Sequence, residues 1–77
     1  MAKYSGNIDG HVVVAELGIS GHWYTEVDGH RMASGFQLVA DRPIEFKVGD
    51  HKVLVRFSGQ IFTHIEVFVD GEKIYSV

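Results

Sequence analysis

Pairs of aspartate and glycine recur about every 20 residues along this 77-residue chain, and they constrain its fold more than any other feature. The pairs are Asp9-Gly10, Asp28-Gly29, Gly49-Asp50 and Asp70-Gly71. Asp-Gly between β-rich segments is typical of a type I′ hairpin turn, which needs positive φ at both central residues, whereas Gly-Asp suits a type II′ turn. The recurrence therefore predicts four consecutive antiparallel hairpins, or about eight strands.

A two-residue turn determines which residues of a hairpin lie opposite one another, so each hairpin can be divided into an inward and an outward face. The separation is cleanest in the third hairpin, where Val48 faces His51 and Phe46 faces Val53. The predicted inward residues are Tyr4, Ile8, His11, Val13, Ala15 and Leu17; Trp23, Thr25, Val27, His30 and Met32; Ile44, Phe46, Val48, His51, Val53 and Val55; and Ile65, Val67, Val69, Glu72, Ile74 and Ser76.

No segment of useful length shows helical spacing of apolar residues without interruption by glycine or β-branched residues, so no helix is expected. Gly35 interrupts the fourth predicted strand and indicates a bulge or bend there, beyond which Phe36 and Leu38 would change sides. A small antiparallel β-sandwich or a closed barrel can bury one face of four hairpins. We therefore expect residues 1–77 to form a single all-β domain, with the sandwich favoured because so short a chain closes a barrel poorly.

The stretch from His51 to Tyr75 ends in the letters VFVDGEKIY. This stretch resembles a hairpin of the β-sandwich domain of Fas apoptotic inhibitory molecules, and it covers about a third of the chain. The resemblance implies a β-sandwich. It carries no functional residue onto this sequence.

Charge and composition exclude several classes of partner. The net charge is −3 and the seven lysines and arginines are scattered singly, so duplex nucleic acid would meet no basic stripe. Apolar runs are too short to insert into a membrane, and the expected location is the cytoplasm. The chain contains no cysteine, so a small core must be supported by packing, by a bound ion or by self-association.

Motifs typical of enzymes are missing from the sequence. It contains no phosphate-binding loop, no dinucleotide fingerprint, no H-E-x-x-H and no G-x-S-x-G. The chain is therefore expected to be a non-enzymatic binding module rather than an enzyme.

Three of the five histidines occupy matching positions, because His11, His30 and His51 each come first after a turn on the predicted inward face. Glu72 holds the same place in the fourth hairpin. Three imidazoles and one carboxylate form a ligand set that divalent metal ions such as Zn²⁺ accept, so a small metal-binding protein is one hypothesis. The other interpretation is that a polar residue is simply tolerated at the wet rim of the core. His22 and His64 fall outside the pattern.

The outward face of the last hairpin is rich in aromatic residues for a surface. Such patches mark association surfaces more often than chance, although the same face could instead pack inside the domain. The favoured hypothesis is therefore a module that binds another protein or a second copy of itself. The predicted interface residues are Phe62, His64, Phe68, Tyr75 and Val77.

Overall fold

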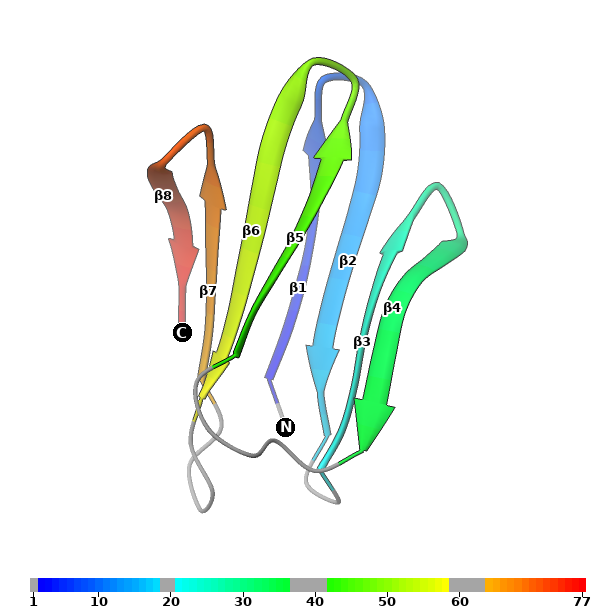
Figure 1. Ribbon diagram of the computed structural model, residues 1–77, viewed down its shortest axis with the longest axis vertical. Coiled ribbons are helices and arrows are strands. Elements are labelled where there is room, and N and C mark those ends of the chain that lie inside the picture. Colours follow the sequence, from blue (N-terminus) through cyan, green and yellow to red (C-terminus); the bar gives the residue numbers. More distant parts are fainter. Residues whose placement is uncertain (1, 19–20, 37–41, 59–63) are drawn as a thin grey trace.

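The computed structural model describes residues 2–18, 21–36, 42–58 and 64–77, and these residues form eight antiparallel strands joined in consecutive hairpins (Figure 1). The described residues contain no helix, and hence none that could cross a membrane. The strands are β1 (Ala2–Ile8), β2 (His11–Leu17), β3 (His22–Val27), β4 (His30–Phe36), β5 (Arg42–Val48), β6 (His51–Ser58), β7 (His64–Val69) and β8 (Glu72–Ser76).

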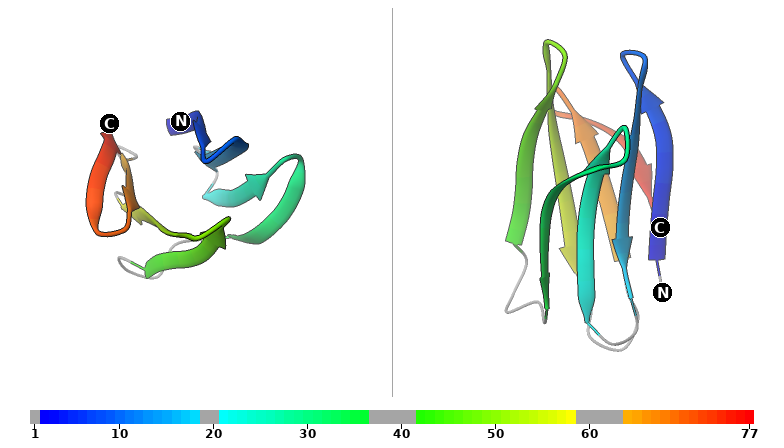
Figure 2. Two further views of the ribbon diagram at one scale, coloured as in Figure 1. Left: turned by 90° about the horizontal axis from the view of Figure 1, so that it is seen from above. Right: turned by 90° about the vertical axis from the view of Figure 1, so that its right-hand side faces the viewer.

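The strands form two separate four-stranded sheets that face one another. The first sheet has the order β1-β2-β3-β4 and the second has the order β5-β6-β7-β8. Seen from above in Figure 2, the two sheets enclose a common interior, and β1 and β2 of the first sheet approach β7 of the second. The fold is therefore sandwich-like, as predicted, and the alternative of a closed barrel is excluded.

The four turns have the backbone conformations that their residues predict. Asp and Gly both have positive φ in the three Asp-Gly turns, with 51° at Asp70 and 86° at Gly71, as type I′ requires. In the remaining turn only Gly49 has positive φ, which fits type II′. All four turns lie toward the same end of the molecule (Figure 1).

Aliphatic side chains from alternate strand positions fill the space between the sheets. Of the residues that the structure describes, those with no exposed surface are Val13, Ala15, Thr25, Val53, Val55, Phe57, Ile65 and Val67. Within the described part of the chain, two aromatic contacts connect the sheets: Trp23 of β3 with Phe57 of β6, and Tyr4 of β1 with Tyr75 of β8, at ring-centroid distances of 5.5 and 4.9 Å. The predicted inward faces of the first and third hairpins are confirmed.

Bulges in β4 and β8 make part of the predicted register wrong. In β4, Met32 is an extra residue that lies between the residues pairing with Glu26 and Thr25 of β3. In β8, Ile74 is an extra residue of the same kind, with no partner in β7. An extra residue reverses the alternation of sides beyond it. Met32 and Ile74 were expected inward, yet each is 46% exposed.

The bulge in β8 also redirects Tyr75, which was expected on the outward face. Its ring packs against the core, and its hydroxyl donates a hydrogen bond to the Lys3 carbonyl at 3.3 Å. His30, Glu72 and Ser76 were expected inward and are exposed. The predicted inward faces of the second and fourth hairpins are therefore confirmed only for β3 and β7.

Gly35 does not mark the bulge, because it pairs regularly with Trp23. A Cβ atom at Gly35 would lie 2.6 Å from the Trp23 ring, so the glycine lets this ring lie across the backbone of β4. Phe36, the next residue, is 56% exposed. Leu38 lies outside the described residues.

The two sheets are versions of one four-stranded unit, so the repeat is a pair of hairpins rather than a single hairpin. His11 of β2 corresponds to His51 of β6, the turn residue Asp28 corresponds to Asp70, and the bulged residue Met32 corresponds to Ile74. This correspondence allows each position of one sheet to be compared with its counterpart in the other.

Candidate functional site

The four predicted metal ligands do not come together. His11 and His51 are half-buried near the turns and each bonds to an aspartate, whereas His30 and Glu72 are exposed. No group of three or more histidine, aspartate or glutamate residues that could hold a metal ion occurs in the described ranges. The metal-site hypothesis required the matching positions of the four hairpins to lie close together. The turns of β3-β4 and β7-β8 instead lie apart from the other two (Figure 1).

Each sheet instead contains a His–Asp pair that links its two hairpins. Nδ1 of His11 lies 2.6 Å from Oδ2 of Asp28, and Nδ1 of His51 lies 2.6 Å from Oδ2 of Asp70. The other carboxylate oxygen of Asp70 accepts a hydrogen bond from the Lys52 amide at 3.0 Å. Asp28 binds the Val12 amide in the same way, at 2.9 Å.

The pair in the second sheet shifts the pKa values of both its members. The hydrogen bond from His51 lowers the pKa of Asp70 below 3.8, assisted by the Lys52 amide. The hydrogen bond to Asp70 raises the pKa of His51 above 6.5, and the charges of Asp70, Asp9 and Asp50 act in the same direction. Each pair joins neighbouring hairpins of one sheet, which is a structural role.

Sequence reasoning missed these pairs because it treated the Asp-Gly dipeptides only as turns. The available signal was that the sequence repeats every two hairpins. In each repeat, the turn aspartate of the second hairpin lies beside the strand of the first hairpin that begins with histidine. In both units the turn aspartate also donates its amide to the carbonyl opposite, from Asp28 to Val12 and from Asp70 to Lys52, both at 2.8 Å.

The residues of the predicted aromatic interface do not form one surface patch in the structure. Tyr75 packs against the core, and Phe62 lies outside the described residues. His64 is exposed, with its Nδ1 donating to the Val77 carbonyl at 3.1 Å, and Val77 is 54% exposed. Phe68 is half-buried on the outer face of the second sheet, where it pairs across the ladder with Leu54.

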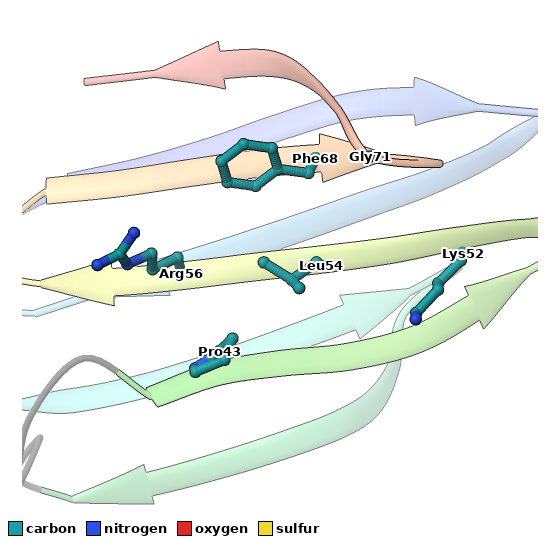
Figure 3. A pocket seen from close by; sticks show the side chains of 6 residues that line it. All are labelled: Pro43, Lys52, Leu54, Arg56, Phe68 and Gly71. Carbon is teal, nitrogen blue, oxygen red and sulfur yellow. The ribbon is translucent and has the colours of Figure 1, made fainter.

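Phe68 belongs to a groove on this outer face. The groove has a volume of about 520 Å³, within the range of small ligand sites. Figure 3 shows that its residues come mainly from β6, with one each from β5, β7 and the last turn. The lining residues are Pro43, Lys52, Leu54, Arg56, Phe68 and Gly71.

The groove has an apolar centre with a cation at either end. Leu54 and Phe68 lie between Lys52 and Arg56, which occupy alternate positions of β6 on the same side as Leu54 (Figure 3). Lys52 also lies 3.5 Å from Glu45, but its side chain is 61% exposed. None of the described residues that line the groove is a carboxylate, although Glu45 lies opposite Leu54 and Glu66 lies opposite Arg56 in the ladder.

The corresponding face of the first sheet carries several paired polar side chains. The Tyr24 hydroxyl donates to Glu16 at 3.1 Å, and Arg31 stacks on the Tyr24 ring at 4.3 Å while binding Glu26 at 3.2 Å. Glu26 holds the position of Phe68, and Glu16 holds the position of Arg56. Val12 and Val14 of the first sheet hold the positions of Lys52 and Leu54, so the combination of Phe68 with two cations is specific to the second sheet.

Compared with protein-family models, with curated proteins and with solved structures, the chain shows no significant match.

Proposed function

We propose that this domain is a non-enzymatic protein-binding module that uses the groove on its second sheet. The observation that carries the proposal is the difference between equivalent positions of the two outer faces. Phe68 and Arg56 of the second sheet hold the positions that Glu26 and Glu16 hold in the first sheet. Half-buried aromatic and arginine side chains are the residue types that contribute most to protein interfaces. On the first sheet the aromatic and arginine side chains, Tyr24 and Arg31, are instead engaged with Glu16 and Glu26 of the same face.

The proposal can be tested by photo-crosslinking in extracts of cells that express the protein. A photoreactive phenylalanine analogue replaces Phe68 in one version and Glu26 in the matched control, so that the probe occupies equivalent positions of the two outer faces. We expect a discrete crosslinked protein at position 68 and none at position 26. An adduct of twice the mass of the chain would identify a second copy as the partner.

Two results would contradict a protein-binding role for this face. The first is no adduct at position 68 although the probe-bearing protein is folded, as judged by circular dichroism. The second is the same set of adducts from both positions, because that would indicate nonspecific contact.

A further inference from the structure

We propose that the groove receives an extended acidic segment of a partner protein, in which an apolar side chain has a carboxylate two residues before it and another two residues after it. This inference rests on the proposed function, because it names the chemistry of the segment that the same groove would bind. It follows from the spacing of three residues on β6 and from the distribution of charge around them.

Spacing along β6 determines the pattern. Lys52, Leu54 and Arg56 are alternate residues of one strand, so their side chains leave the same face at intervals of about 7 Å. An extended peptide has the same two-residue interval between side chains on one side. Carboxylates at the outer positions would therefore reach Lys52 and Arg56 while the central side chain contacts Leu54.

The central position requires an apolar side chain. Phe68 lies beside Leu54 on the neighbouring strand, and Pro43 borders the groove from β5 (Figure 3). Together these three side chains form an apolar floor that is open to solvent. An aliphatic or aromatic side chain placed there removes apolar surface from water on both partners, which favours association.

Charge complementarity selects an acidic partner. Both charged residues among the described lining of the groove are cations, although the chain as a whole carries a net charge of −3. Two carboxylates flank the groove, since Glu45 lies 3.5 Å from Lys52, and Glu66, which is opposite Arg56 in the ladder, lies 3.3 Å from Lys73. Exposed pairs of this kind are weak, so a carboxylate of the partner can replace Glu45 at Lys52.

A protein segment fits this surface better than nucleic acid does. Two cations about 13 Å apart, with an apolar floor between them, do not follow the dense phosphate spacing of a nucleic acid strand. Lys47 and Lys73 lie on the same face, opposite Lys52 and Phe68, but the carboxylates of Glu45 and Glu66, opposite Leu54 and Arg56, interrupt this row of cations.

A library of random peptides displayed on phage and selected on the purified protein tests the pattern directly. We expect enrichment of sequences with acidic residues on both sides of a central apolar residue, at two-residue intervals. Selection is repeated on the double variant Lys52→Glu, Arg56→Glu, and on the control Lys3→Glu, Arg31→Glu, which changes the charge equally on the opposite sheet. The milder pair Lys52→Gln, Arg56→Gln serves if charge reversal prevents folding.

Binding of the enriched peptide is then measured by fluorescence anisotropy. We expect affinity to fall at least tenfold in the groove variant, to stay within twofold in the control and to weaken as salt is added. An oligothymidylate should not displace the peptide. The inference is overturned if nothing is enriched, if enriched peptides lack the acidic pair, if the groove variant selects the same peptides, or if oligothymidylate competes.

Failure of this inference is distinguishable from failure of the proposed function. If crosslinking at position 68 captures a protein while selection yields no acidic pattern, the face binds protein but the chemistry of the segment is wrong. If neither experiment succeeds, the protein-binding role itself is contradicted.

Discussion

The Nδ1 atom of His51 lies 2.6 Å from the Oδ2 atom of Asp70, so a side chain of β6 is bonded to the turn between β7 and β8. The same relationship between His11 and Asp28 joins β2 to the turn between β3 and β4. One aspartate thus forms the turn of its own hairpin and also holds the neighbouring hairpin in register.

Replacing Asp70 should lower stability in two distinguishable steps. Asp70→Asn retains an oxygen for the Lys52 amide and tolerates the φ of 51°, but it loses the charge that binds His51. Asp70→Ala loses both interactions. We expect the unfolding temperature to fall in the order wild type, Asn variant, Ala variant. Asp50→Asn, in the adjacent turn, is the charge-matched control, and an equal fall there would show that the pair has no specific role.

The contribution of the second pair should depend on pH in a defined direction. The pKa of His51 is raised above 6.5, so its stabilisation is present below pH 6.5 and is lost as pH rises through the raised value. The pKa of Asp70 is lowered below 3.8, so its stabilisation is present above pH 3.8 and is lost as pH falls through the lowered value. The pair should therefore contribute most between about pH 3.8 and 6.5.

Two measurements check this pH dependence. An NMR titration of the His51 ring should give a pKa above 6.5, which should decrease in Asp70→Asn. The difference in unfolding temperature between the wild type and Asp70→Asn should be largest inside the window and should shrink outside it. A His51 pKa at or below 6.5 in the wild type would contradict the assigned hydrogen bond.

Much of the fold is predictable from the sequence because turn chemistry and polarity agree. The Asp-Gly pairs determine where the chain reverses, and alternation then assigns residues such as Val13 and Val55 to the core. The bulges are not predictable in this way. The extra residues are Met32 and Ile74, which are apolar and fit an inward register in the sequence equally well.

The groove could not be predicted for a related reason. Its six residues come from three strands and a turn, so the juxtaposition depends on the strand order of the second sheet. Sequence patterning singled out Phe68 correctly as an outward residue, but it grouped this residue with Tyr75, which the β8 bulge turns inward. The His–Asp pairs likewise depend on which hairpins are neighbours.

Thr25 is fully buried, and its hydroxyl has no hydrogen-bond partner among the residues that the structure describes. The corresponding residue of the second sheet is Val67, which is equally buried. Because an unpaired buried hydroxyl is costly, Thr25→Val should raise the free energy of unfolding by about 1 kcal/mol. The reciprocal Val67→Thr should lower it by about 1 to 3 kcal/mol. Chemical denaturation measures both, and a loss of stability in Thr25→Val would show that the hydroxyl is satisfied.

Replacing Tyr75 and Phe68 separately by glutamate tests which of the two lies on the surface. Tyr75 packs 4.9 Å from Tyr4 between the sheets, so Tyr75→Glu should destabilise the fold by about 3 kcal/mol. Phe68→Glu should fold normally, because Glu26 already occupies the equivalent position of the first sheet without disrupting it. Denaturation curves give the two stabilities. Equal losses for both variants would mean that Phe68 is part of the core, and the outer groove would then not exist as described.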